Sequence, residues 1–145
     1  AFKNADIEEI VFHDNTESIS LDRYAFAGSK IKSLNVPVKG TDQYSFQDCL
    51  YLESITLHES TTKIEYMSFS GCTNLKTIVC PLQSAPQADY SAFGTGSKNY
   101  TGRNTYNTGE NVLYVPAGAT GYDTGVFLFP LCNPECCGFT ISYTL

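Results

Sequence analysis

The chain has little positive charge and no long apolar run, and each absence excludes a class of function. Its 145 residues carry 9 Lys and Arg against 15 Asp and Glu, for a formal net charge of −6. Without a basic block, nucleic acid and anionic membranes are poor partners. No segment approaches the roughly 18 consecutive apolar residues that a membrane-spanning helix needs. The first residues contain no signal-peptide apolar run, and the start at Ala1 rather than Met indicates a processed or excised chain.

Motifs for catalysis are also missing. The sequence contains no G-x-S-x-G, no phosphate-binding loop and no H-E-x-x-H. No Cys has a plausible His partner in a loop, and adjacent acids such as Glu8 and Glu9 point in different directions on a short strand or turn. We therefore predict a domain that is not an enzyme and needs no cofactor.

What the sequence does contain is an internal repeat. From Phe46 it reads Phe-x2-Cys-x2-Leu-x2-Ile-x-Leu, and from Phe69 the same spacing recurs with Cys80 in the last place. A copy from Phe26 is one residue shorter and has Ser29 where the others have Cys. The apolar residue at the centre of each unit recurs at steps of 24, 21, 23 and 35 residues, at Ile10, Leu34, Ile55, Ile78 and Leu113.

A unit of this length containing L-x2-I-x-L is typical of a leucine-rich repeat, in which I-x-L is a short strand with both apolar side chains pointing inward. A small residue precedes each Phe, so we interpret each Phe as a plug on the convex side of its rung. The sequence thus predicts a leucine-rich repeat solenoid with capped ends. Its short strands would stack in one parallel sheet, with few or no regular helices and an irregular convex side.

Three segments carry a family resemblance: Tyr24-Ala25-Phe26, the run from Phe69 to Ile78, and the closing run from Leu113 to Gly118. Together they resemble the BspA-type leucine-rich repeat family of bacterial surface proteins, over about residues 5–122. The resemblance implies an exported domain, extracellular or on the cell surface, used in adhesion or in binding host macromolecules. It implies no catalytic residues. Ser29, the long insertion after Phe93 and the tail 131–145 depart from the pattern.

We expect residues 1–145 to form a single domain. Its predicted parts are an N-terminal cap and half rung (1–20), regular repeats (21–93), an inserted polar loop (94–111), and a last rung with a C-terminal cap (112–145). The loop is built from Gly, Thr, Asn and Tyr and has no aliphatic residue, which favours a surface position. The cap is expected to add a strand over 138–143.

The cysteines divide into two groups. Cys49 and Cys72 share the repeat position of Ser29, and Cys80 falls at an inward strand position, so we predict free, buried thiols. The cluster near the C-terminus is open to three interpretations: a disulfide, a set of metal ligands, or packing within the cap. It lacks a nearby His as fourth zinc ligand, so we predict no metal site; its members are Cys132, Cys136 and Cys137.

Two further sets of residues occupy matching positions in successive repeats, and neither predicts a ligand site. His13 and His58 follow the strand two rungs apart, roughly 9 to 10 Å at the usual strand spacing, which is too far to share a metal ion. A second column alternates in charge and is expected to place opposite charges on neighbouring rungs, which favours register. Its members are Glu8, Lys32, Glu53 and Lys76.

Two surfaces are candidates for binding. The loop sets Tyr100, Arg103 and Tyr106 among Ser, Gly and Asn, a composition typical of adaptable binding loops, and Tyr114 is expected nearby. The alternative is the outward face of the strands, or a loop without any partner. We predict a binding or adhesion module for a protein or glycan ligand; the alternative is a structural spacer or docking domain of a larger surface protein. The sequence assigns no oligomeric state.

Overall fold

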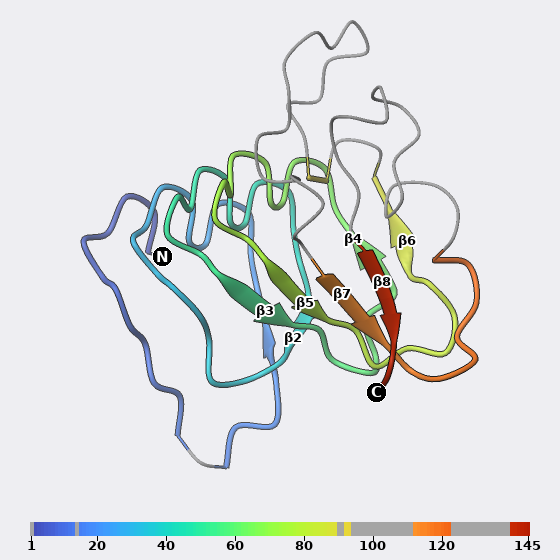
Figure 1. The fold of residues 1–145 in the computed structure, drawn as a ribbon. Coiled ribbons are helices and arrows are strands. Elements are labelled where there is room, and N and C mark those ends of the chain that lie inside the picture. The colour runs from blue at the N-terminus through green and yellow to red at the C-terminus, as the bar shows by residue number, and fades with distance from the viewer. Residues whose placement is uncertain (1, 14, 90–91, 94–111, 123–139) are drawn as a thin grey trace, which may run out of the picture.

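A computed structural model describes residues 2–13, 15–89, 92–93, 112–122 and 140–145, and these ranges contain short parallel strands and no helix (Figure 1). The turn segments lie side by side along the upper edge of the ribbon, and the largest sheet crosses its front. The strands are β1 (Ile19–Ser20), β2 (Val38–Gly40), β3 (Ser54–Thr56), β4 (Lys63–Ile64), β5 (Thr77–Val79), β6 (Gln87–Ala88), β7 (Val112–Val115) and β8 (Thr140–Tyr143).

The largest sheet contains the predicted apolar ladder. Its strand order is β3-β5-β7-β8, and all its pairs are parallel. Ile55, Ile78 and Leu113 stand in one register and are buried, and Ile141 of β8 continues the row as a partly buried residue. The two earlier members, Ile10 and Leu34, lie outside the named strands and pack against the core as partly buried side chains. The predicted added strand is present at 140–143, while 138–139 lie outside the described residues.

A second side of the solenoid also carries strands, which the prediction of one sheet did not include. β1 pairs with β2, and β4 pairs with β6, each in parallel. These strands precede the turns and bury one apolar side chain each from β2 and β4, Val38 and Ile64. Their backbone groups are paired between rungs because buried N–H and C=O groups need partners. The rungs that contain β3 and β5 therefore make strand contacts on two sides, because β4 and β6 follow those strands.

The Phe plugs form one continuous stack. Successive ring centroids lie 5.2 to 5.4 Å apart and successive planes are within 14° of parallel. Phe26, Phe46 and Phe69 are at most 1% exposed, which confirms their predicted role as plugs. Phe2 extends the stack at its N-terminal end, where it is 36% exposed. The whole column is Phe2, Phe26, Phe46, Phe69 and Phe93.

Backbone hydrogen bonds hold the Phe column together, and they all run in one direction. The N–H of each Phe donates to the carbonyl that precedes the next Phe, at 2.7 to 2.8 Å. Two residues after each Phe the pattern repeats, from Asn4 to Ala27, from Gly28 to Gln47 and from Asp48 to Ser70. In every case the donor belongs to the earlier rung and the acceptor to the later one.

The residue two places after each of the first four Phe residues of the stack adopts a left-handed backbone. Asn4, Gly28, Asp48 and Gly71 have φ between 56° and 79°, and Gly, Asn and Asp are the residues that tolerate this region. A Cβ atom at Gly28 would collide with the Asn4 carboxamide, and one at Gly71 would collide with the Asp48 carboxylate. The two glycines therefore suit the backbone angle and leave room for the side chain of the preceding rung, which would have to move if a Cβ were present.

The thiols of the repeats belong to the core. Cys49, Cys72 and Cys80 are free and fully buried, as predicted. The Cys49 Sγ donates to the carbonyl of Phe26 at 3.0 Å, and the Cys72 Sγ donates to that of Phe46 at 3.0 Å. Each of these thiols thus ties its rung to the plug of the rung before it. The cluster of Cys132, Cys136 and Cys137 lies outside the described residues.

Cys80 has a partner that the repeat pattern does not indicate. The Tyr122 hydroxyl lies 3.2 Å from its Sγ and donates to the carbonyl of Leu82 at 2.9 Å. Tyr122 is a fully buried ring in the segment after β7. Burial raises the pKa of both the Cys80 thiol and the Tyr122 hydroxyl, so both stay protonated at neutral pH.

Candidate binding surface

The predicted loop site lies largely outside the described residues. Tyr100, Arg103 and Tyr106 belong to 94–111, which the structure does not describe. Tyr114 is described: it lies on β7, partly buried, in register with Val79 of β5 and Ser142 of β8. The structure therefore places one of the four predicted residues, on the outward face of the largest sheet.

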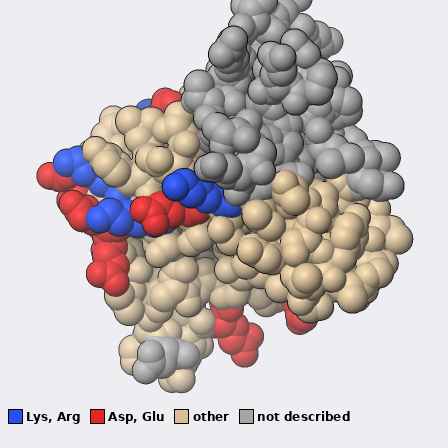
Figure 2. Space-filling model, viewed as in Figure 1, with Lys and Arg blue, Asp and Glu red and all other residues tan. Residues whose placement is uncertain are grey.

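That sheet face carries no charged residue within its named strands. Its outward positions form two rows across β3, β5, β7 and β8: Ser54, Thr77, Val112 and Thr140, and Thr56, Val79, Tyr114 and Ser142. Figure 2 shows charged side chains gathered over the N-terminal rungs, and an uncharged surface toward β7 and β8. The face offers small side chains and a single ring, which are weak anchors for a ligand.

The alternating charge column forms in part. Lys32 and Glu8 make an ion pair with Nζ and Oε2 3.2 Å apart, and the backbone N–H of Lys76 donates to the carbonyl of Glu53 at 2.9 Å. Within the described ranges, no ion pair joins the side chains of Glu53 and Lys76. Long exposed side chains gain little from pairing in water, so register here comes from the backbone.

A third surface carries a column of tyrosines, which we call the tyrosine ledge and define as Tyr24, Tyr44 and Tyr66. Tyr24 and Tyr44 stack with centroids 4.8 Å apart and planes at 7°. Tyr66 meets Tyr44 edge-on at 83° with centroids 5.3 Å apart. The Lys3 Nζ lies 4.4 Å from the centre of the Tyr24 ring. All three rings are partly exposed, two or three residues before the buried Phe plugs.

The ledge stands on strained backbone. Tyr24 and Tyr44 have φ of 59° and 61°, and Met67 occupies the equivalent position with φ of 51°. Bulky residues are uncommon in this region, where Gly or Asn would be favoured. In the third rung Tyr66 comes one residue earlier than Tyr24 and Tyr44 do in theirs. The offset accompanies the turned ring of Tyr66.

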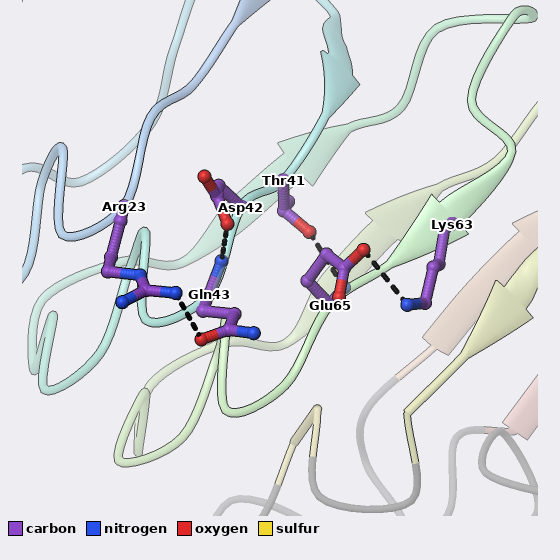
Figure 3. Close-up of polar contacts among 6 residues, drawn as sticks. All are labelled: Arg23, Thr41, Asp42, Gln43, Lys63 and Glu65. Carbon is purple, nitrogen blue, oxygen red and sulfur yellow. Dashed lines mark hydrogen bonds and ion pairs between the residues drawn. The ribbon is translucent and has the colours of Figure 1, made fainter.

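Polar side chains of residues one to three places before the ledge tyrosines contact one another or the backbone (Figure 3). Arg23 Nη2 donates to Gln43 Oε1 at 2.8 Å, and Lys63 and Glu65 form an ion pair at 3.0 Å. The Asp42 carboxylate accepts the backbone N–H of Gln43 at 2.6 Å. These polar groups are thus held by one another and by the backbone.

Its surroundings keep the Tyr44 hydroxyl neutral. Burial raises the pKa of Tyr44, the neighbouring Tyr66 and Tyr24 raise it further, and the charge of Arg23 acts in the opposite direction. Because the ordinary pKa of Tyr is already 10.0, the hydroxyl stays protonated at neutral pH. At Tyr44 the ledge therefore offers a hydroxyl that can donate and accept hydrogen bonds.

Two further properties of the described residues complete the surface. None of their His, Cys, Asp and Glu side chains gather in groups of three or more that could hold a metal ion. In the same residues, no helix has the length and apolarity to cross a bilayer.

The parallel strands, the inward apolar ladder and the repeated plugs define a leucine-rich repeat solenoid. Residues 1–111 match the BspA-type leucine-rich repeat region in six copies, so the chain belongs to that family. This is a family of repeat modules of surface proteins. No curated protein and no solved structure matches the chain.

Proposed function

We propose that this domain is a non-catalytic binding module of an exported surface protein, and that it recognises a protein or glycan ligand. The observation that carries the proposal is the display of aromatic and polar side chains on turns fixed by the buried Phe stack. Rigid rings lose little entropy on binding, so a preorganised column of this kind is suited to recognition. Family membership supports a surface module and does not specify the ligand.

The inserted loop remains part of this proposal. Tyr100, Arg103 and Tyr106 are residue types that dominate interface energetics, and Tyr114 supplies a ring on the adjoining strand. We propose that these residues add contacts to the ligand. Because the loop contains no aliphatic residue, we expect it to lie outside the core, and a variant with residues 95–109 replaced by a short Gly-Ser turn is expected to fold.

A binding screen tests the proposal. The purified domain is passed over immobilised extracellular-matrix proteins and over a glycan array, beside the loop-replaced variant. We expect saturable binding to at least one ligand class, with a loss of about tenfold or more in the variant if the loop supplies an anchor. Binding to neither class would reject the binding module and favour a structural spacer. Full binding by the folded variant would remove the loop from the site.

A further inference from the structure

The two ends of the Phe stack differ in how far they are covered. Phe93 at the C-terminal end is 4% exposed, whereas Phe2 at the N-terminal end is 36% exposed. Ile7 in the first rung is likewise only partly buried, while the equivalent Ile31 of the next rung is fully buried. The first rung, at the left of the ribbon in Figure 1, therefore presents an apolar end face. We call this face the open end and define it as Phe2, Ile7 and Ile10.

The backbone of the open end also has groups without partners. Along the turns, the N–H two residues after a Phe donates to the carbonyl one residue after the next Phe, as it does from Asn4 to Ala27. The equivalent acceptor of the first rung is the Lys3 carbonyl, which receives no N–H from the described residues. On the strand side the direction is reversed: Lys32 donates its N–H to the Glu8 carbonyl, and the N–H of Glu8 has no acceptor among the same residues. Unpaired N–H and C=O groups at an edge are a template for pairing with another chain.

A second copy of this chain does not fit the open end. Two copies joined through their Phe2 rings would place carbonyl against carbonyl on the turn side and N–H against N–H on the strand side, and leave these groups unpaired. A copy joined head to tail would have to offer the other end of its Phe stack, and that end is already covered at Phe93. The open end therefore suits a different partner, whose chain runs in the same sense as the first rung.

The interior rungs show which residues such a partner needs. Neighbouring rungs are joined by stacked Phe rings and by the one-way N–H bonds of the turns. At the left-handed position after each Phe, a side chain in one rung alternates with Gly in the next: Asn4, Gly28, Asp48 and Gly71. A Cβ at either Gly would meet the side chain of the preceding rung. Because Asn4 has a Cβ, a rung stacked before it is expected to carry Gly at this position.

We propose that the open end docks a leucine-rich repeat rung of a partner protein, which stacks on the first rung and runs in the same sense. A Phe of the partner packs on the free side of Phe2. Two residues later, a Gly of the partner donates its N–H to the Lys3 carbonyl, and on the strand side a partner carbonyl accepts the Glu8 N–H. This extends the sheet and the stack by the contacts that already join the rungs. The site is separate from the tyrosine ledge and from the inserted loop, so its failure would leave the proposed function standing.

A synthetic peptide of residues 26–45 serves as the probe, because it carries Phe26 and Gly28 at the required spacing. The intact, isotope-labelled domain is titrated with it and followed by nuclear magnetic resonance. We expect saturable shifts confined to the first rung, and slower hydrogen exchange of the Glu8 amide, which gains an acceptor. Peptides with Phe26→Ala or Gly28→Asp are expected to bind about tenfold or more weakly.

Variants of the domain test the two sides of the contact. Phe2→Ala is expected to raise the Kd of the peptide about tenfold or more, because the ring that it stacks on is lost. The control is Tyr51→Ala, an exposed ring away from the open end, with a Kd within about twofold of wild type. Asn4→Gly removes the Cβ and should restore binding of the Gly28→Asp peptide, just as Gly71 accommodates Asp48 in the interior.

A fusion provides a further control. A copy of residues 26–45 joined directly to Phe2 in place of Ala1 covers the open end, so the fused domain is expected not to bind the free peptide. Thermal melting shows whether each variant is folded before affinities are compared. The proposal would be overturned by an absence of saturable binding to wild type, by equal binding of the Gly28→Asp peptide, or by wild-type affinity in folded Phe2→Ala. Undiminished binding by the fusion would likewise place the peptide elsewhere on the domain.

Discussion

Two aromatic columns run along the same turns of this solenoid, and they differ in what surrounds them. The Phe column is buried apart from Phe2, and its interior planes are within 11° of parallel. The tyrosine ledge, two or three residues earlier in each turn, is partly exposed and turns by 83° at its third ring. One repeat period thus produces both a core and a surface. The position within the turn decides which.

The largest effect should come from breaking the buried column. Phe69→Ala is expected to lower the free energy of unfolding by about 3 to 5 kcal/mol, because a fully packed ring is lost. Tyr44→Asn should change it by no more than ~1 kcal/mol, since that ring is partly in water already. Urea unfolding followed by circular dichroism compares them. Similar losses of unfolding free energy in the two variants would contradict the view that the Phe column forms the core and the tyrosine ledge the surface.

The buried side of the turns should also respond to alkaline pH. Burial raises the pKa of the Cys72 thiol above its ordinary value of 9.0, so the unfolded chain loses this proton first. The contribution of the protonated Cys72 thiol to the free energy of unfolding is complete below about pH 9. It is lost as pH rises beyond that, by at most about 1.4 kcal/mol per pH unit. Cys72→Ala should make unfolding curves recorded above pH 9 less pH-dependent. An unchanged slope in that variant would contradict the prediction.

A smaller effect, an increase in stability, is expected from replacing the two serines that directly precede Phe46 and Phe69. The hydroxyls of Ser45 and Ser68 are buried and have no hydrogen-bond partner within the described part of the chain. The equivalent residues of other rungs are Ala25 and Ala92. Ser45→Ala and Ser68→Ala should therefore be neutral or stabilise by up to about 1 kcal/mol.

A matched control comes from Thr61, which is buried like the two serines but whose Oγ1 donates to the carbonyl of Val38 at 3.2 Å. Thr61→Val should destabilise, since it removes that bond and leaves a buried carbonyl with one partner fewer. Calorimetry of the three variants compares the signs. A loss of more than ~1 kcal/mol in either serine variant would show that its hydroxyl has a partner after all.

Removal of metal ions is expected to have no effect on stability. Addition of a chelator should leave the melting temperature unchanged, because the sequence completes no zinc site from its histidines or from Cys132, Cys136 and Cys137. A lower melting temperature after chelation, restored by added zinc, would make those cysteines metal ligands.

Repeat spacing was sufficient to predict the interior. Inward ladder, plugs and buried thiols all recur at fixed positions, and a rung that cannot bury its own apolar face must stack. Phe2 was missed because no earlier copy precedes it. Its spacing to Ile7, Ile10 and Phe12 nevertheless matches that of Phe26 to Ile31, Leu34 and Val36. A comparison of these two segments would have placed Phe2 at the end of the stack.

The ledge could not be predicted in the same way. Tyr66 is one residue out of phase with Tyr24 and Tyr44, so the column does not recur at a constant spacing. Left-handed backbone at tyrosine has no sequence signal, unlike that at Gly28 or Gly71. Tyr122 was missed for another reason: it lies beyond the last matched repeat, and only the fold brings it to Cys80.

The one-way hydrogen bonds of the Phe column make the molecule modular in a particular sense. Along the Phe column, the N–H groups of alternate residues in one turn donate to the following turn, and carbonyls accept from the preceding turn. A turn inserted in the reverse sense would face carbonyl with carbonyl and leave polar groups unpaired. Whole units can therefore be added or excised, as by removing the 23 residues from Phe46 to Ser68, whereas inverted or fractional units cannot. The solenoid can therefore lengthen or shorten by whole repeats, but it cannot accept a repeat that runs in the reverse sense.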